Sequence, residues 1–178
     1  MAMTIAELSA SIRCIPNFPK PGIVFRDITT LLKDPASLKA VNEILVERYK
    51  DSKIDKVVGI ESRGFIVGAS LALALGAGFV PIRKKGKLPA ETIREEYVLE
   101  YGTDTIEIHK DAITKGERIL LHDDLLATGG TIAAAMKLVE RLGGTIVETA
   151  FLIELTFLHG RRNLTGHNIF SIVKIDQE

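Results

Sequence analysis

Two spacings of hydrophobic residues alternate along the 178-residue chain, one typical of helices and one typical of buried strands. Near the amino terminus, apolar side chains recur every three or four positions at Ile5, Leu8, Ile12 and Ile15. This spacing places them on one face of a helix, and Pro16 disfavours helical geometry in the residue before it. The pattern therefore predicts an amphipathic helix that ends before Pro16.

Beyond residue 33, apolar runs of strand length alternate with segments of helix length. The predicted strands cover residues 56–60, 79–82, 118–122, 145–155 and 169–175. The predicted helices cover a segment that begins after Asp34 and the segments 65–75 and 132–142. Asp34 is a favoured N-cap residue, and Pro35 suits the first helical position. The order of strands and helices favours an α/β fold with an open, mainly parallel twisted sheet and helices on both faces.

Two segments fall outside this alternation. Residues 1–33 are interrupted by prolines and glycines and add no further strand–helix unit. In residues 92–108, large apolar and polar side chains alternate, which predicts a β-hairpin or a mobile flap at about residues 88–108. Because no repeat or linker interrupts the chain, we expect one domain over residues 1–178, with its core in residues 34–178.

The charge of the chain is balanced, since 23 Lys and Arg residues face 23 Asp and Glu residues. A neutral chain has no overall attraction to nucleic acid or to an anionic membrane, so we expect neither as a partner. No apolar stretch reaches the roughly 18 residues of a membrane span, and the first residues do not resemble a secretion signal. Any anion that the protein binds must therefore be held by a local site.

Cysteine and histidine give little support for a disulfide or a metal centre. Cys14 is the only cysteine, and the four histidines show no metal-ligand spacing. We therefore expect a reducing, cytoplasmic location and no metal ion held mainly by protein side chains.

The segment with the clearest chemical character is residues 123–131, Asp-Asp-Leu-Leu-Ala-Thr-Gly-Gly-Thr, between a predicted strand and a predicted helix. In open α/β sheets, ligands bind at the carboxyl ends of the strands. The free N–H groups at the start of the helix suit a phosphate, and Gly129 and Gly130 allow the main chain to approach it. The carboxylates of Asp123 and Asp124 suit sugar hydroxyls or water bound to a magnesium ion.

Other nucleotide-binding loops do not fit the chain. No GxGxxG follows a predicted strand, and Gly86-Lys87 lacks the upstream glycine of a P-loop. The simpler alternative is that the acidic pair caps a loop and that the two glycines only shape a turn. The length of the nine-residue string favours the binding site over that alternative.

Residues 123–131 resemble the phosphoribosyl-diphosphate-binding motif of the type I phosphoribosyltransferases. Further segments resemble, in the same order, those of the adenine-specific members of that family: residues 18–28, 61–65, 82–89 and 99–102. The resemblance extends from about residue 13 to residue 162. His122 departs from it, because family members usually have an aliphatic residue before the acidic pair. Its two interpretations are a charge that tunes sugar affinity and a neutral ring bonded to a backbone carbonyl.

The resemblance implies transfer of the phosphoribosyl group from 5-phosphoribosyl 1-diphosphate to N9 of adenine, which gives AMP and diphosphate. It also implies Mg²⁺, bound mainly through the substrate and water. The bond from C1 to the diphosphate must break through an oxocarbenium-like state. The site must therefore neutralise the leaving group, orient a ring nitrogen, handle a proton and exclude water.

The resemblance assigns residues to each of these tasks. The phosphoribosyl group is expected to contact Asp123, Asp124, Ala127, Thr128, Gly129, Gly130 and Thr131. The diphosphate is expected to contact Ser62, Arg63, Arg83, Lys84, Lys87 and Tyr101. Adenine is expected to contact Val24, Phe25, Arg26 and Leu155. The expected catalytic residues are Arg63 and Glu100, whose carboxylate would take the proton from N7 of the purine.

Three further features follow from the resemblance. Residues 1–33 become a hood over the base, and the flap closes over the site to exclude water. The peptide bond at Glu61-Ser62 is expected to be strained and cis. The loop that carries Arg83 is expected to serve the site of a neighbouring subunit, so a homodimer is implied.

Several alternatives stay open at the level of sequence. Taken singly, the basic loop would be a solvated face, Phe25 a core residue and Glu100 an exposed hairpin residue. Competing functions are a phosphoribosyltransferase for 6-oxopurines, a ligand-sensing transcriptional regulator and a subunit of a diphosphate-synthesising enzyme. The hood segment and residues 99–102 favour adenine over the oxopurines. The neutral charge and the chain length disfavour the other two.

Overall fold

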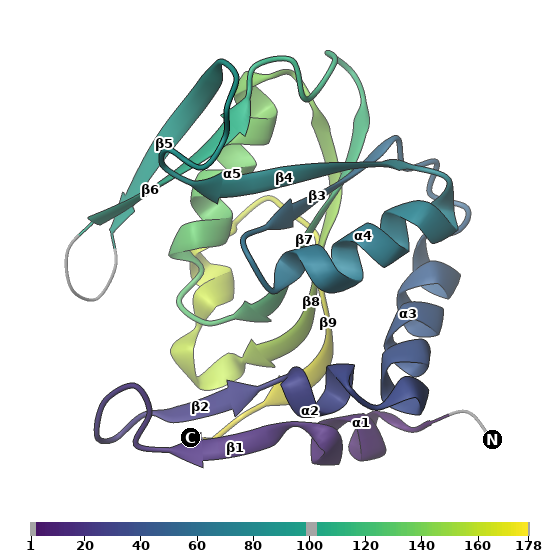
Figure 1. Ribbon diagram of the computed structural model, residues 1–178, viewed down its shortest axis with the longest axis vertical. Coiled ribbons are helices and arrows are strands. Elements are labelled where there is room, and N and C mark those ends of the chain that lie inside the picture. Colours follow the sequence, from purple (N-terminus) through teal and green to yellow (C-terminus); the bar gives the residue numbers. More distant parts are fainter. Residues whose placement is uncertain (1–2, 99–102, 178) are drawn as a thin grey trace.

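A computed structural model describes residues 3–98 and 103–177, and its centre is a seven-stranded sheet in the order β5-β6-β4-β3-β7-β8-β9 (Figure 1). The strands of the sheet are β3 (Lys56–Ile60), β4 (Gly78–Lys84), β5 (Thr92–Val98), β6 (Thr103–His109), β7 (Arg118–Leu126), β8 (Thr145–Leu155) and β9 (Ile169–Ile175). All pairings from β4 to β9 are parallel, and β6 and β5 extend the sheet with antiparallel pairing. The predicted parallel core is thus confirmed.

Helices cover both faces of the sheet, as predicted (Figure 1). Of these, α3 (Pro35–Tyr49) and α4 (Gly64–Leu75) pack on one face and α5 (Gly130–Arg141) on the other. The remaining elements are α1 (Ile5–Ser11), α2 (Thr29–Leu32) and the short 3-10 turns η1 (Thr156–Leu158) and η2 (Gly160–Asn163). Side chains of a strand alternate between the two faces of the sheet. On β3, Val57 therefore packs against α3 and α4 on one face, and Val58 packs against α5 on the other. In the described segments, 3–98 and 103–177, no helix has the length and apolar character needed to cross a bilayer.

The amino-terminal helix is shorter than predicted. A capping box between Thr4 and Glu7 starts α1, but Ile12 already has extended geometry. Residues 13–16 form β1 (Arg13–Pro16), which pairs antiparallel with β2 (Val24–Asp27) and places Ile15 opposite Phe25. The extended chain gains this pairing and an ion pair from Arg13 to Asp27, which helical periodicity cannot reveal.

The hood, residues 3–33, lies along one end of the sheet beside β9 and the carboxyl terminus (Figure 1). Arg26 Nη2 donates to the carbonyl oxygen of Gln177 at 3.4 Å, which joins the two ends of the chain. This contact places β2 near the carboxyl end of β8, where the acidic motif of β7 also lies.

The strand β7 continues beyond its predicted end. It was expected to stop at His122, yet it pairs with β8 as far as Leu126 opposite Glu154. The acidic pair therefore lies within a strand, where Asp123 and Asp124 point to opposite faces. Only residues 127–129 separate β7 from α5, so the turn before the helix is short.

The predicted hairpin is confirmed as β5 paired with β6, from Thr92 opposite His109 to Val98 opposite Thr103. It lies against α5 (Figure 1), and Glu95 accepts from Lys137 at 3.0 Å and from Arg141 at 3.2 Å. The residues between the strands, 99–102, lie outside the described part of the chain.

Candidate active site

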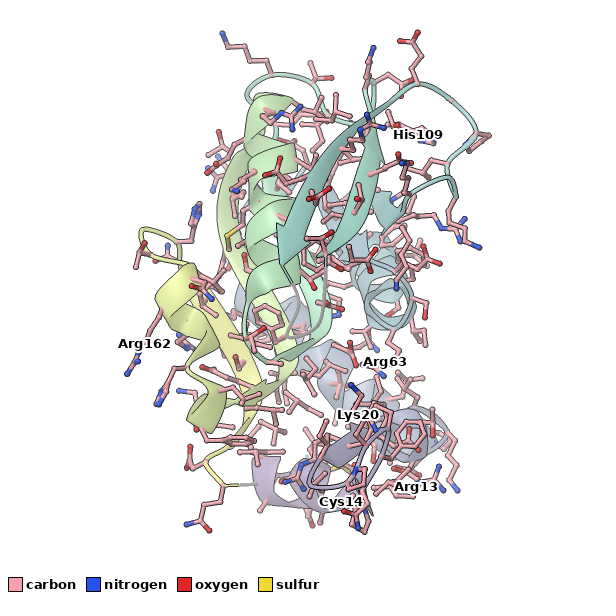
Figure 2. All side chains as sticks on the ribbon, turned by 90° about the vertical axis from the view of Figure 1, so that its left-hand side faces the viewer. Arg13, Cys14, Lys20, Arg63, His109 and Arg162 are labelled. Atoms are coloured by element: carbon pink, nitrogen blue, oxygen red, sulfur yellow. The ribbon has the colours of Figure 1, made fainter. Side chains whose placement is uncertain are left out.

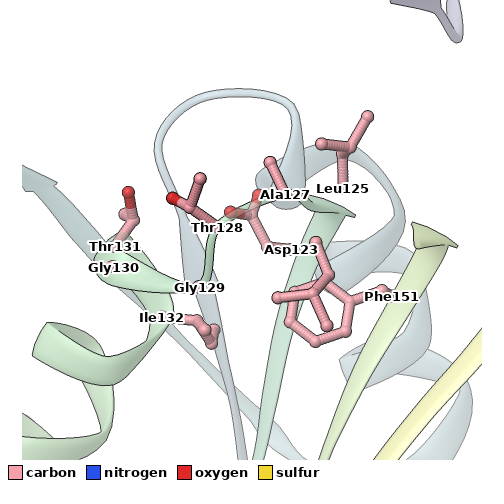
Figure 3. Close-up of a pocket in the computed structure, with 10 residues that line it drawn as sticks. Asp123, Leu125, Ala127, Thr128, Gly129, Gly130, Thr131, Ile132 and Phe151 are labelled. Carbon is pink, nitrogen blue, oxygen red and sulfur yellow. The ribbon is translucent and has the colours of Figure 1, made fainter. Parts of the chain in front are cut away.

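The turn from β7 to α5, here called the phosphate loop (residues 127–131), encloses a cavity of about 320 Å³. Figure 3 shows the hydroxyls of Thr128 and Thr131 on the same side of the loop as the carboxylate of Asp123. Gly129 has a φ of 85°, a conformation that L-residues with a side chain adopt only with strain. The first N–H groups of the 12-residue helix α5 have no partner within the helix, which suits an anion.

The acidic pair provides two unlike carboxylates. Asp124 is 4% exposed, and its Oδ2 accepts from Arg63 Nε at 2.6 Å. The amide of Asp124 donates to Asp123 Oδ1 at 2.9 Å. Burial, and then the neighbouring charge of Asp124, raise the pKa of Asp123 well above its usual value. A ligand that donates hydrogen bonds to Asp123, such as a sugar hydroxyl, favours its ionised form.

A larger cleft of about 1000 Å³ adjoins the phosphate loop. It is lined by Ile60, Glu61, Ser62, Arg63, Lys84, Tyr97, Asp123, Asp124, Leu125 and Thr131. Asp123, Leu125 and Thr131 line both spaces, so the cleft and the loop cavity lie side by side. Four segments that are distant in the sequence thus bring cations, carboxylates and a helix N-terminus together at the carboxyl ends of the strands.

Two residues of the basic loop, Arg83 and Lys87, are not part of the cleft lining. The Nε and Nη2 atoms of Arg83 donate to the Glu61 carboxylate at 3.2 and 3.1 Å, and its Nη1 donates to the carbonyl of Lys87. Burial would raise the pKa of Glu61, but the hydrogen bonds from Arg83 and from the Lys84 amide lower it below its usual value. Arg83 and Lys87 therefore lie beside the cleft, whereas Lys84 lines it.

The hood meets the core at Arg63. Its Cζ atom lies 5.2 Å from the centre of the Phe25 ring, and Phe18 packs edge-on against the same ring. Figure 2 shows Arg63 between the core and the hood segment that carries Lys20. Arg63 thus contacts the acidic pair on β7 and the aromatic side chain proposed to hold a base.

The other expected base contacts lie around Phe25. Arg26 donates to Cys14 Sγ at 2.6 Å and to the carbonyl of Gln177, so its guanidinium binds within the hood and the carboxyl-terminal segment. Val24 is half-buried at the start of β2. Leu155 ends β8 and packs against the core. Of the expected base contacts, Phe25 touches the cleft lining, through its contact with Arg63.

Three residues of the site were not predicted to be part of it: Tyr97 and Gly160 lie outside the motifs, and Glu61 lies in the segment 61–65 but was given no contact. Tyr97 lines the cleft and donates to Asp104 Oδ2 at 3.4 Å, and burial raises its pKa. Glu61 lines the cleft and holds Arg83. Gly160 supports the phosphate loop, because a Cβ atom there would overlap the carbonyl oxygen of Ala127. For Tyr97, the sequence does give one signal: the alternation of residues 92–98 places its side chain on one face of the predicted hairpin.

His122 is fully buried on the opposite face of β7 from Asp123. Its Nδ1 lies 2.9 Å from the carbonyl oxygen of Ala150, which only accepts, so Nδ1 carries the proton. Burial lowers the pKa of His122 to about 4, and Nε2 has no hydrogen-bond partner. The hypothesis of a neutral ring bonded to a backbone carbonyl is confirmed.

The remaining expectations fall on the 61–65 turn and on the flap. The Glu61-Ser62 peptide bond is cis, as the resemblance implies. Glu100 and Tyr101 lie outside the described residues. Across residues 3–98 and 103–177, no three acidic, His or Cys side chains are grouped to hold a metal ion. The donors on the cleft wall are carboxylates, which suit Mg²⁺ in combination with substrate oxygens.

Comparison with known proteins gives the same picture as the geometry. The family described as "Phosphoribosyl transferase domain" matches residues 27–175. An adenine phosphoribosyltransferase of Solibacter usitatus is 58% identical, covering 96% of this chain and 99% of its own. A crystal structure of the Thermoanaerobacter pseudethanolicus enzyme of that name is 54% identical, with a TM-score of 0.94 and coverage of 97% of this chain and 100% of its own.

A third similar protein is the adenine phosphoribosyltransferase of Saccharomyces cerevisiae, crystallised with an imino-altritol bisphosphate and adenine. It is 43% identical, with a TM-score of 0.89, and the match covers 94% of this chain and 97% of the yeast chain. The family match spans most of the chain, and the relatives match it over nearly their whole length. The chain therefore belongs to the phosphoribosyltransferase family, among its adenine phosphoribosyltransferases.

Proposed function

We propose that the cleft transfers the phosphoribosyl group of 5-phosphoribosyl 1-diphosphate to N9 of adenine, giving AMP and diphosphate. One observation carries this proposal: the phosphate loop lines a cavity beside a cleft that holds the acidic pair and the cations Arg63 and Lys84, and the two spaces share Asp123, Leu125 and Thr131. That arrangement matches a substrate with a phosphate, a sugar and a diphosphate in a row. Membership of the family supports the same reaction.

The 5′-phosphate binds in the phosphate loop. The free N–H groups at the start of α5 and the hydroxyls of Thr128 and Thr131 donate to its oxygens, and Gly129 and Gly130 leave room for it. The ribose then lies over the acidic pair, where Asp123 and Asp124 accept hydrogen bonds from its hydroxyls. Ala127 completes the wall of this subsite.

The diphosphate binds Ser62, Arg63 and Lys84. Arg63 is 40% exposed in its side chain and paired with Asp124, so it can exchange partners when the substrate enters. Ribose hydroxyls replace the guanidinium on Asp124, and diphosphate oxygens replace Asp124 on the guanidinium. This exchange delivers a planar cation to the leaving group and leaves both side chains with hydrogen-bond partners.

Arg83 and Lys87 are also proposed to act on the diphosphate, because they lie in the same basic loop as Lys84. Lys84, between them, lines the cleft, and Glu61 fixes the orientation of Arg83. In the family, the corresponding loop serves the site of the neighbouring subunit. Their charges thus contribute to the positive field at the leaving group in the assembled enzyme.

Adenine stacks on Phe25, with Leu155 on its other face and the main chain near Val24 and Arg26 reading its amino edge. The ring of Phe25 already holds one flat cationic group, the guanidinium of Arg63, 5.2 Å from its centre. A planar base fits the same face when Arg63 turns to the diphosphate. The structure of the Saccharomyces cerevisiae relative, which holds adenine, supports a base subsite in this family.

Glu100 accepts the proton from N7 as N9 attacks C1, and Tyr101 donates to the ribose or the diphosphate. Tyr97, three residues before Glu100, lines the cleft. Closure of the flap over the site excludes water that would otherwise hydrolyse the sugar.

Mg²⁺ binds with the substrate in this proposal. The residues fit that arrangement, because Asp123 and Asp124 supply carboxylates to the cleft while the described chain groups no full set of ligands. When bound, the ion neutralises charge on the leaving diphosphate. The chain itself supplies the cations, the carboxylates and the helix N-terminus that orient the substrate.

The proposal includes a homodimer in the cytoplasm. The outer face of α4 is apolar, with Ile66 49% and Leu73 84% exposed, although a solvent-facing helix usually carries polar residues there. The α4 helix begins directly after Arg63, so a second copy packed on it would lie next to the site. The exposed thiol of Cys14 is consistent with a reducing compartment.

The test is AMP formation from adenine and 5-phosphoribosyl 1-diphosphate with Mg²⁺, run in parallel with hypoxanthine, guanine and xanthine. We expect turnover with adenine alone. Turnover with an oxopurine would retain the phosphate chemistry and refute the base subsite. Absence of turnover with all four bases would refute the proposed reaction.

A further inference from the structure

The phosphate loop lies directly on the main chain of η2. A Cβ atom on Gly160 would overlap the carbonyl oxygen of Ala127, and one on Gly129 would lie 2.5 Å from the carbonyl oxygen of Gly160. Two backbone segments at this separation have no room to shift independently. The position of η2 therefore fixes the position of the loop.

A side chain of the same turn adds a second contact. Asn163 Nδ2 donates to the carbonyl oxygen of Thr128 at 2.8 Å. In a trans peptide unit the C=O and the following N–H point in opposite directions. Because the carbonyls of Ala127 and Thr128 face η2, the N–H groups of Thr128 and Gly129 point away from it. This is the orientation in which they can donate to an anion.

The turn η2 is only four residues long and needs support from outside, since short 3-10 turns have weak internal hydrogen bonds. Arg161 provides it by a bidentate pair with Glu154 on β8, Nε to Oε1 at 2.6 Å and Nη2 to Oε2 at 2.7 Å. Arg161 Nη1 also donates to the carbonyl of Ile169 on β9. Ser171 donates to Glu154 Oε2 at 2.7 Å, and Glu154 is 4% exposed.

These contacts join β8 and β9 to the phosphate loop through one turn. Arg161 lines neither the loop cavity nor the cleft, and its charge is neutralised by Glu154. It therefore has no direct part in substrate binding. We infer that Arg161, with Glu154 and Asn163, is a positioning residue for the phosphate loop and sets the affinity for the 5′-phosphate. This inference rests on the proposed binding of that phosphate in the loop.

The experiment compares two probes that divide the substrate. Ribose 5-phosphate carries the 5′-phosphate, and inorganic diphosphate carries the leaving group; both affinities are measured by calorimetry on the full chain. Asn163→Ala removes one hydrogen bond from an exposed side chain. The double variant Glu154→Gln/Arg161→Met removes the bidentate ion pair between Arg161 and Glu154 without leaving a buried charge unpaired. Arg162→Met is the matched control, because Arg162 is exposed and points away from the loop (Figure 2).

We expect Asn163→Ala to weaken ribose 5-phosphate at least threefold and the double variant at least tenfold. In both, the KM for 5-phosphoribosyl 1-diphosphate rises in parallel, and diphosphate affinity stays within twofold of the parent. Arg162→Met changes neither affinity. A lower Tm with unchanged ribose 5-phosphate affinity would overturn the inference, as would an equal loss for diphosphate. If the double variant does not fold, Asn163→Ala decides the question alone.

One more variant separates this inference from the proposed function. Thr131→Val removes a loop hydroxyl that the proposed function assigns to the phosphate. If it leaves ribose 5-phosphate affinity unchanged, the assignment of the loop fails. If it weakens the affinity while Asn163→Ala and the double variant do not, only the positioning role of Arg161 fails.

Discussion

His122 is the residue whose environment departs most from what its sequence position suggests. It is a neutral ring in the core, with a pKa of about 4 against 6.5 for an unperturbed histidine. The unfolded chain takes up a proton as the pH falls through 6.5, whereas the folded chain does so only near 4. Stability is therefore lost as the pH falls through this window, by up to about 3 kcal/mol from this one residue.

We expect the free energy of unfolding in urea to fall between pH 6.5 and pH 5 and the slope to be smaller in His122→Leu. Above pH 5, the carboxylates whose pKa values lie below the usual range contribute little. The raised pKa of Asp123 contributes with the opposite sign in both proteins, so the difference between the parent and His122→Leu reports the histidine. Equal slopes for the parent and His122→Leu would contradict the assignment. A His122 ring signal that titrates near pH 6.5 in NMR spectra would contradict it as well.

Asp124 links the sugar subsite to Arg63, so its carboxylate affects binding of one substrate only. We expect Asp124→Asn to raise the KM for 5-phosphoribosyl 1-diphosphate at least tenfold and to leave the KM for adenine within threefold. A tenfold rise corresponds to about 1.4 kcal/mol of lost binding. Asp111→Asn, which alters an exposed carboxylate outside the cleft lining, serves as the control. Similar KM values for Asp124→Asn and the parent would refute the ribose contact.

Glu100 is proposed to handle the proton, and chemistry should depend on its carboxylate. We expect Glu100→Gln to slow single-turnover AMP formation at least a hundredfold with little change in substrate affinity. Glu96→Gln on the same hairpin is the control, because Glu96 is exposed. A loss below tenfold, about 1.4 kcal/mol of transition-state stabilisation, is too small for a proton-transfer role.

At the scale of single residues, the sequence predicts those parts of the site that lie within one short segment. The acidic pair, Gly129 and Gly130 form one continuous string, so their joint position needs no tertiary knowledge. Tyr97 and Gly160 reach the site from elements that are distant in the sequence, and neither lies in a recognisable motif. The orientation of Arg83 toward Glu61 is likewise a tertiary choice, made where β3 and β4 end side by side.

Elements with a strong internal signal were predicted well. The strands β8 and β9 have the predicted bounds, and α3 begins at Pro35 after the Asp34 cap. Errors occur where pairing with another strand decides the outcome. Residues 13–16 extend because β2 is beside them, and β7 continues to Leu126 because β8 does.

The hairpin β5–β6 is tied to α5 through the middle of β5. Glu95 is the common partner of Lys137 and Arg141, and Arg141 also donates to the carbonyl of Arg94. We expect Glu95→Gln to accelerate amide exchange in β5 by up to about thirtyfold, since it removes two partly exposed ion pairs that contribute about 0.2–1 kcal/mol each.

Hydrogen exchange followed by mass spectrometry checks this expectation. Glu91→Gln is the matched control, because Glu91 pairs with Lys110 within the hairpin and does not contact α5 through that pair. Exchange in β3 and β7 should stay unchanged in both variants. Equal acceleration by Glu91→Gln would show that the ties to α5 do not restrain the hairpin.

The whole molecule combines a predictable core with a hood whose position is set by non-local contacts. Alternation of strands and helices is enough to predict the parallel sheet, because each unit forms from neighbouring residues. Nothing in residues 1–33 specifies that β2 lies beside the carboxyl terminus, which Arg26 contacts through Gln177. The base subsite, built where hood and core meet, therefore needed the resemblance to a family and then the structure.

The apolar outer face of α4 is the surface on which we propose that a second chain packs. Its inner side chains, Val67 and Leu71, are fully buried, yet Ile66 and Leu73 on the outer face are 49% and 84% exposed. A helix that is apolar all round is stable in water only when both faces are covered. The same face of a second copy is its own complement about a two-fold axis.

Sedimentation at micromolar concentration is expected to give twice the chain mass of 19.5 kDa. Because Leu73 packs little within its own chain, Leu73→Lys should leave the fold intact, shift the mass toward 19.5 kDa and raise the KM for 5-phosphoribosyl 1-diphosphate, since each site loses its neighbour's basic loop. Ile5→Lys, on exposed α1, should keep the parent mass. A single-chain mass for the parent would refute the dimer, and a Leu73→Lys dimer would move the interface away from α4.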